Sequence, residues 1–170
     1  MTVLLPPDGS ALDVVPAGRY AVQVNTGTTE TPTWVFVNGL TSFGPSFEPT
    51  LEDDTDITSD GWASQAVAGN AFSIAIEGLV KGTDDETTST FVPDPGMTAI
   101  VEASKQTGSD AHLHMRHWRT DNYPEALEYH VAVNATLTPG KPNELQKFSG
   151  TLTGRGKPKD ITKPEEPVTP

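Results

Sequence analysis

The sequence contains no cysteine, which excludes disulfide bonds, thiol nucleophiles and cysteine-based zinc sites. Positive charge is scarce, with 11 Lys and Arg against 23 Asp and Glu, so the 170 residues carry a formal net charge of −12. Non-specific binding to nucleic acids or anionic membranes is therefore not expected, because both depend on basic residues. No apolar run approaches the roughly 20 residues of a membrane span, and no signal peptide is predicted.

Sequence motifs for catalysis are also missing. We find no Gly-x-Ser-x-Gly elbow, phosphate-binding loop or zinc-protease helix. The spacing Asp54-x-Asp56 resembles the start of a calcium loop, but Ser59 and Gln65 stand where an EF-hand needs glycine and glutamate. We therefore predict neither an enzyme nor a cofactor, and interpret the acidic segment as a hydrated loop.

Histidines are concentrated in one predicted strand. His112 and His114 share one face of it, and His117 points to the other. An imidazole pair can bind zinc, so His112 and His114 are weak candidates for a metal site. The competing interpretation, which we prefer, is a polar strand face at a surface or subunit contact.

The chain alternates apolar and polar residues in several short stretches, which is typical of half-buried strands. Asp94 and Pro95 have the positions of a helix cap and first helical residue, which predicts one helix over residues 94–106. Asn38-Gly39 indicates a hairpin turn, and Pro45 indicates an edge strand or a bulge. The fold class expected is mainly β, a sandwich or rolled barrel with one flanking helix and one long projecting loop. The predicted strands are residues 19–25, 34–37, 43–47, 70–81, 111–120, 128–137 and 144–154.

The expected organisation has three parts. An irregular arm covers residues 1–18, a β domain residues 19–156, and a tail rich in proline and charge residues 157–170, which should be disordered in isolation. Within the β domain, residues 48–69 form a long projecting loop, with a hairpin as one form of it.

Charge is unevenly distributed between the projecting loop and the C-terminal part. Residues 48–69 contain six acids and no base, together with Trp62, which is either an anchor for a partner or packed on its own domain. Opposite charges of this kind can steer copies of a chain toward each other. The candidate contact residues in the loop are Glu52, Asp53, Asp54, Asp56, Asp60 and Trp62, and the candidate basic surface is Lys141, Lys147, Arg155 and Lys157.

Several short motifs occur in an order that resembles a known family. They are Trp34-Val-x-Val37-x-Gly39-Leu40-x-Ser42-Phe43, Asp60-Gly61-Trp62, Phe72-Ser-Ile74, and Phe148-Ser-Gly-Thr-Leu-Thr-Gly154-Arg-Gly156-Lys-Pro158. Over roughly residues 18–158 the chain is similar to the major tail tube protein of long-tailed, siphovirus-type bacteriophages, especially those of actinobacteria. Too few residues follow position 158 for the family's optional immunoglobulin-like domain.

The resemblance implies a structural virion protein of the phage tail, made in the host cytoplasm. Such proteins form rings, usually of six subunits, that stack into a tube enclosing the tape-measure protein and conducting DNA during ejection. The implied partners are the chain itself, the tape-measure protein, and the tail terminator and tail-tip proteins. In the family, a loop corresponding to residues 48–69 reaches the neighbouring ring. Glu77, on the non-core face of the predicted strand 70–81, is a candidate for the channel lumen.

A second function class stays open from the sequence. A secreted β-sandwich binding module could read carbohydrates or another ligand with exposed aromatic side chains such as Trp34, Trp62 or Trp118. The missing signal peptide and the long acidic loop argue against this alternative.

Overall fold

The structure is a computed structural model, and it describes residues 19–58, 60–85 and 90–165. The predicted arm, residues 1–18, and the last five residues of the predicted tail lie outside this part. In chain order the elements are β1 (Tyr20–Asn25), β2 (Trp34–Phe36), β3 (Leu40–Asp53), β4 (Gln65–Leu79), β5 (Gly82–Asp85), β6 (Thr90–Pro93), α1 (Pro95–Ala103), a 3-10 turn (Gly108–Ala111), β7 (His112–Arg119), β8 (Ala126–Thr138), β9 (Lys147–Gly154) and β10 (Lys159–Asp160).

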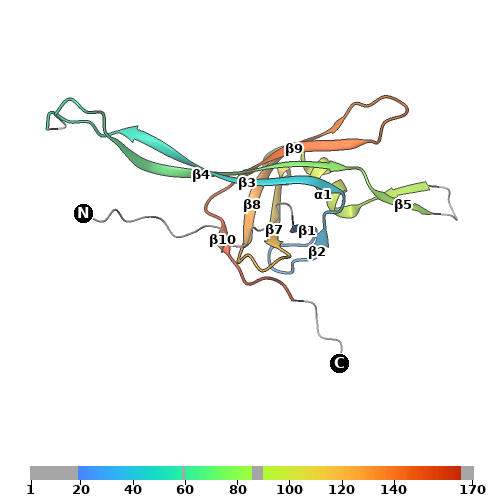
Figure 1. Cartoon of the computed structure of the whole chain (residues 1–170). Helices are drawn as coiled ribbons and strands as arrows, with labels where there is room; N and C mark the ends of the chain where they lie inside the picture. Colours follow the sequence, from blue (N-terminus) through green and yellow to red (C-terminus); the bar gives the residue numbers. More distant parts are fainter. Residues whose placement is uncertain (1–18, 59, 86–89, 166–170) are drawn as a thin grey trace, which may run out of the picture.

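One antiparallel sheet of eight strands forms the body of the molecule (Figure 1). Its order is β2-β1-β7-β8-β9-β4-β3, with β10 paired to β8, while β5 and β6 form a separate ribbon. The sheet curls on itself and brings its two sides together. Phe43 of the end strand β3 lies 5.1 Å, between ring centroids, from Tyr20 of β1, the second strand from the other end. The prediction of a mainly β fold with one helix is confirmed. None of the helices in the described residues is long and apolar enough to cross a membrane.

The core lies on the inner face of this curled sheet. Phe72, Ile74 and Ile76 share this face of β4 and are buried, as their alternation predicted. Phe148 and Leu152 of β9 are buried beside them. Each such side chain contributes roughly 1.5–3 kcal/mol of burial free energy, so the core holds the four strands β8, β9, β4 and β3 in place.

The helix α1 closes the core from the inner side of the sheet. Met97 and Ile100 belong to the core cluster. Asp94 caps the helix, because its Oδ2 accepts the Met97 N–H at 2.9 Å and its Oδ1 accepts the Asn38 side-chain amide at 2.7 Å. The predicted start is therefore confirmed, while the helix ends at Ala103 rather than at residue 106.

The prediction of a hairpin turn at Asn38-Gly39 is wrong. These residues connect β2 and β3, which lie at opposite ends of the sheet, so the chain crosses there instead of folding back. Gly39 has φ +87°, and a Cβ on it would lie 2.3 Å from the Leu79 carbonyl oxygen. Glycine is required by this close approach of two backbones rather than by a type I′ turn.

The predicted disorder of the tail is also wrong for residues 157–165. Strand β9 ends at Gly154, which leaves the start of β8 without a neighbour on that side. Strand β10 pairs there, and the Ile161 N–H donates to the Ala126 carbonyl at 3.0 Å. Backbone pairing with β8 thus orders a segment that has no apolar pattern of its own.

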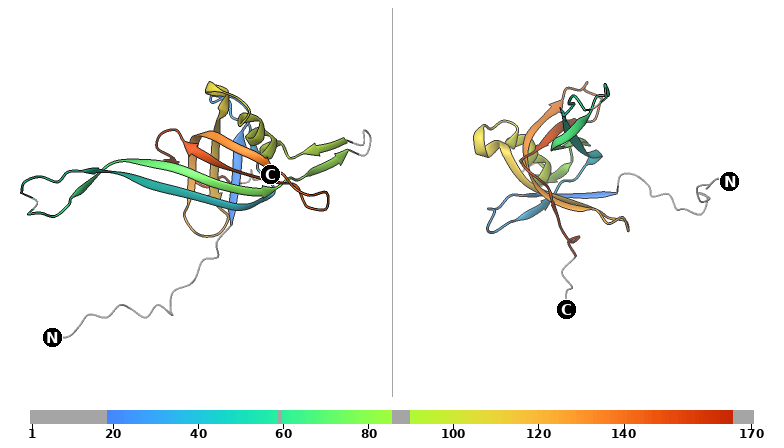
Figure 2. Two further views of the ribbon diagram at one scale, coloured as in Figure 1. Left: turned by 90° about the horizontal axis from the view of Figure 1, so that it is seen from above. Right: turned by 90° about the vertical axis from the view of Figure 1, so that its left-hand side faces the viewer.

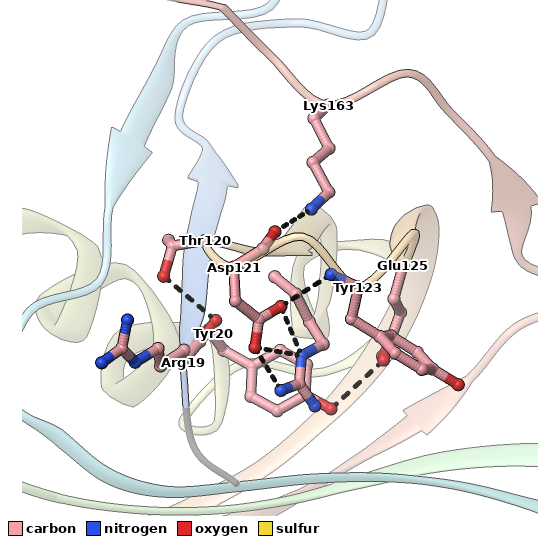
Figure 3. Close-up of polar contacts among 8 residues, drawn as sticks. Arg19, Tyr20, Thr120, Asp121, Tyr123, Glu125 and Lys163 are labelled. Carbon is pink, nitrogen blue, oxygen red and sulfur yellow. Dashed lines mark hydrogen bonds and ion pairs between the residues drawn. The ribbon is translucent and has the colours of Figure 1, made fainter. Parts of the chain in front are cut away.

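A polar cluster fixes the end of this segment (Figure 3). Lys163 Nζ donates to the Asp121 carbonyl oxygen at 2.6 Å. The Asp121 carboxylate in turn pairs with the Arg119 guanidinium and accepts the Tyr123 N–H at 3.1 Å. The Arg119 hydrogen bonds lower the pKa of Asp121, so this carboxylate stays ionised and keeps the β7–β8 turn in the shape that receives Lys163.

Candidate assembly surfaces

Strands β3 and β4 continue far beyond the body as a two-stranded ribbon (Figures 1 and 2). The last residue of β4 that pairs with β9 is Ser73, and from there toward the tip only β3 and β4 pair with each other. Residues 48–69 are thus a β-hairpin with a short connecting segment, not an irregular loop. A bulge between Thr50 and Leu51 breaks the alternation that would have indicated strands.

The tip of the ribbon forms a set of short side-chain caps. The Thr55 N–H donates to Asp53 Oδ1 at 2.9 Å, and the Thr58 N–H donates to Asp56 Oδ1 at 2.8 Å. Hydrogen bonds from Thr55 lower the pKa of Asp53, which keeps that carboxylate charged. The tip therefore has defined turn chemistry while remaining fully negative.

Apolar side chains on the ribbon are exposed. Trp62 is 80% exposed and Ile57 completely so. The interpretation that Trp62 packs on its own domain is therefore wrong for the single chain. An exposed tryptophan beside a second exposed apolar residue indicates a contact surface.

The five predicted acidic contact residues lie in the same ribbon tip as Trp62. All five are exposed, and they lie at the end of the ribbon farthest from the body. Their positions are Glu52 and Asp53 at the end of β3, and Asp54, Asp56 and Asp60 in the connecting segment.

The four predicted basic residues do not form one surface. Lys141 and Lys147 lie at the β8–β9 end of the sheet, whereas Arg155 and Lys157 follow the opposite end of β9. The eight residues of β9 span roughly 26 Å at about 3.3 Å per residue, which separates the two pairs. The sequence placed them together only because they are close along the chain.

A second group of exposed apolar residues lies on the side opposite to the ribbon (Figures 1 and 2). Leu145, in the β8–β9 connection, is 72% exposed. Phe91 and Val92 are exposed on β6. The molecule thus projects apolar side chains from both ends.

The outer face of β8, β9, β4 and β3 is different from both ends. Three cross-strand rows contain small, hydroxyl and amide side chains, and Glu77 is the only charged residue in them. The sequence predicted the outward position of Glu77 but not this uniform surrounding. The rows are Ala132-Thr153-Ser73-Ser46, Asn134-Thr151-Ala75-Gly44 and Thr136-Ser149-Glu77-Ser42.

The same four strands have two open edges. Strand β3 ends the sheet and has no neighbour beyond it in the described residues. On the far side, β7 reaches only to Ala132 of β8, so residues 133–138 of β8 have β9 on one side and no strand of the described chain on the other. Because the four strands alternate in direction, β3 and β8 run antiparallel to each other.

The predicted histidine pair is engaged in other contacts. Arg155 contacts His112 Nδ1 at 3.2 Å, and His114 Nε2 lies 2.9 Å from Glu128. His114 also stacks on His130 at 4.4 Å between ring centroids, and burial together with His114 lowers the pKa of His130. In the part of the chain that the structure describes, no three His, Cys, Asp or Glu side chains are placed to hold a metal ion.

His117 belongs to the core instead. It is fully buried, with Nδ1 3.0 Å from the Tyr129 hydroxyl and Nε2 3.1 Å from Glu125. Burial lowers the pKa of His117, and the hydrogen bond and charge of Glu125 raise it in part. The net lowering favours a neutral imidazole that connects β7 and β8.

The three tryptophans of the alternative hypothesis do not form one exposed surface, although Trp34 and Trp118 both lie against Arg116. The Arg116 guanidinium covers Trp34 at 4.2 Å from the ring centroid, and Trp118 is almost completely buried. Only Trp62 is widely exposed, and it lies at the ribbon tip. The described residues therefore contain no shared aromatic platform of the kind that a sugar-binding module would use.

Comparison with known proteins identifies the fold. No family model and no curated protein matches the sequence. Among solved structures, a chain from the tail of an empty gene transfer agent (GTA) particle with C6 symmetry has a TM-score of 0.62 at 12% identity, covering 88% of this chain and 100% of that one. The SPP1 tail tube has a TM-score of 0.61 at 11% identity, covering 88% and 81%. A chain of the anti-feeding prophage (AFP) baseplate has a TM-score of 0.52 at 8% identity, covering 85% and 94%. The chain has the fold of phage tail tube proteins.

Proposed function

We propose that this protein is a structural subunit of a siphovirus-type phage tail, without enzymatic activity, which polymerises as stacked rings into the tail tube. The observation that carries the proposal is the four-stranded sheet β8-β9-β4-β3, which combines two open edges with an outer face whose three central rows contain one charged residue, Glu77. The shared fold with tail tube structures supports it. An actinobacterial phage as the source rests on the sequence resemblance alone.

Ring closure would use the two open edges. Strand β3 of one subunit would add to residues 133–138 of β8 in the next, and repetition around a ring would pair both of these open edges in every subunit. Pro45 and Pro49 remove two amide donors from β3, which limits the hydrogen bonds that a partner strand can make. The ring would have six subunits, like the C6-symmetric tail that shares the fold.

The outer face of the four strands would then line the channel. The three central rows contain no Lys or Arg, and Lys147 follows in the next row toward the β8–β9 connection, so passing DNA would meet few counter-charges for its phosphates. Glu77 would place one carboxylate per subunit in that wall and weakly repel the passing DNA. Such a lumen conducts DNA without binding it specifically.

Stacking would use the ribbon. Its exposed Trp62 and its acidic tip project away from the body and would reach the adjacent ring. The expected partners are other copies of the chain, then the tape-measure protein in the lumen, and the tail terminator and tail-tip proteins at the two tube ends. The protein would assemble in the host cytoplasm and reside in the virion tail.

Electron microscopy of the purified chain at high concentration, with tail components added, tests this function. We expect rings or tubes, because obligate contacts between strand edges commonly bury roughly 2,000 Å² or more. A chain that stays monomeric at millimolar concentration under these conditions contradicts the proposal. Glycan binding by such a monomer would support the alternative of a secreted carbohydrate-binding module.

A further inference from the structure

A groove of about 610 Å³ opens where the ribbon separates from the rest of the sheet. Its floor contains the aromatic pair Phe47 and Phe72, whose ring centroids are 4.9 Å apart. One wall is formed by the chain after β9, including Lys157 and Pro158. Phe47 remains 57% exposed, so the single chain leaves apolar surface uncovered in the groove.

The chain after β9, which forms one wall of this groove, is held in place on both sides of the groove. Gly154 lets the chain lie against Phe72, because a Cβ there would come within 2.9 Å of the ring. Beyond the groove, β10 pairs with β8 and Lys163 is tied to the Asp121 carbonyl. The groove is therefore preformed in the single chain, and its wall is an ordered segment.

We propose that this groove receives Trp62 from another copy of the chain, in the adjacent ring. The inference rests on the proposed function, since it names the contact that joins two rings. A molecule's own Trp62 lies beyond Gln65, and the ribbon from Gln65 to Asn70 at the groove is already about 17 Å long at roughly 3.3 Å per residue. A molecule's own Trp62 therefore does not reach its own groove, and a Trp62 bound there would come from a second copy.

Charge identifies the ribbon tip as the occupant. The ribbon tip that carries Trp62 contains five acids and no base, whereas the chain beside the groove carries the exposed Lys157 and Lys159, with Asp160 after them. The other projecting apolar residue, Leu145, lies in a connection with two bases, Lys141 and Lys147, and one acid, Glu144, so its net charge has the same sign as this wall. Opposite charges steer the acidic tip to the groove and disfavour the β8–β9 connection.

Cysteine cross-linking tests the contact, because the natural chain has no cysteine to give background. Ala63→Cys leaves Trp62 intact at the tip, and Asn70→Cys lies at the groove. Mixed tubes of the two variants, treated with a short bis-maleimide, should give a cross-linked dimer. Mixing Leu145→Cys with Asn70→Cys is the matched control and should give none.

The outcomes separate this contact from the general function. Tubes in which Leu145→Cys cross-links and Ala63→Cys does not would overturn the groove contact and leave the tube function standing. Cross-linking of Ala63→Cys to Asn70→Cys in isolated pairs that never form rings would overturn the adjacent-ring assignment. Absence of any assembly would overturn both.

A double-mutant cycle tests the partners energetically. Trp62→Ala should raise the protein concentration needed for tube formation by about tenfold or more, as expected for an aromatic hot spot. Phe47→Ala should have a similar effect, and the double variant should be little worse than either single one, because both remove the same contact. Ile57→Ala, at the same tip, should change that concentration less than about twofold. Fully additive effects of Trp62→Ala and Phe47→Ala would contradict the groove contact.

Discussion

The two halves of the β3–β4 strand pair differ sharply in what surrounds them. Near the body, β4 pairs with β9 and buries Phe72, Ile74 and Ile76 in the core. Toward the tip, the same two strands pair with no other strand of the described residues, and Leu51 and Val67 stay exposed. An isolated two-stranded ribbon is marginal in water, so the outer half needs a partner that the single chain does not supply. Contacts within the single chain stabilise the inner half of the strand pair, and we expect contacts with a partner to stabilise the outer half.

The largest effect on the free energy of unfolding is expected from a substitution in the core beside the inner half of the strand pair. Phe148→Ala removes a buried ring that packs over Gly78 of β4, and should lower the free energy of unfolding by about 3–5 kcal/mol. Urea unfolding of the single chain measures this loss. Trp62→Ala is the control from the outer half and should change the same free energy by less than about 0.5 kcal/mol. Equal effects of the two substitutions would contradict the division into a folding half and an assembly half.

The next largest effect is expected from a substitution in the outer half, and it concerns assembly alone. Trp62→Ala should cost about 2 kcal/mol at every contact between rings and so abolish stacking at concentrations where the natural chain forms tubes, while each subunit stays folded. Sedimentation and electron microscopy of the variant measure the loss of tubes, and circular dichroism checks the fold. Normal polymerisation of Trp62→Ala would exclude the ribbon tip as the inter-ring contact.

Hydrogen exchange sharpens the same comparison. Amides of residues 48–69 should exchange rapidly in the free subunit and become protected in the tube, because the partner supplies the missing neighbour. Amides of β4 between Phe72 and Ile76 should be protected in both states. Equal protection of residues 48–69 in the free and assembled protein would show that assembly does not order the ribbon.

Acid should weaken the body through His117. Its pKa is lowered in the folded state by burial, so the unfolded chain binds more protons around the ordinary histidine pKa of about 6.5. Stability is therefore complete above this pH and falls as the pH drops through it. Urea unfolding between pH 8 and 5 measures the slope, which His117→Gln should flatten. If the variant retains the slope, another group carries the acid sensitivity, such as His130, whose pKa burial also lowers.

The smallest effect on stability belongs to the outer face. Glu77→Lys lies on an exposed strand position and should leave folding and tubes intact. It would place a ring of positive charge in the channel and slow DNA ejection from particles carrying it. Glu77→Gln controls for simple loss of the carboxylate. Ejection kinetics equal to those of the natural particle would remove Glu77 from the lumen.

Local chemistry explains what the sequence predicted well. The alternation around Ile74 and the Asp94 cap depend only on residues a few positions away. Pro45 likewise indicated an edge strand, and β3 is at the edge. Mainly β architecture followed from such local patterns, since each short strand carries its own signal.

Features set by distant parts of the chain were not predictable in the same way. Asn38-Gly39 has the composition of a hairpin turn, and only the close approach of Leu79 shows that it is a crossing. The order of residues 157–165 depends on where β9 stops along β8, which no local pattern gives. The basic residues were grouped by chain proximity, although β9 separates them.

The outer face of β8, β9, β4 and β3 could be predicted in part from the sequence. Ser149, Thr151 and Thr153 alternate with core residues in the sequence, so their shared side of β9 was readable. That they continue rows through Ser73 and Asn134 required the register between strands. A channel wall is a property of this register and not of any one strand.

A cryo-electron microscopy map of the assembled protein tests the central claim most directly. We expect β3 of one subunit to pair antiparallel with residues 133–138 of β8 in its neighbour, with Glu77 and Thr151 facing the lumen. A map in which these edges stay apart, or in which the outer face of the four strands points away from the channel, would contradict the account.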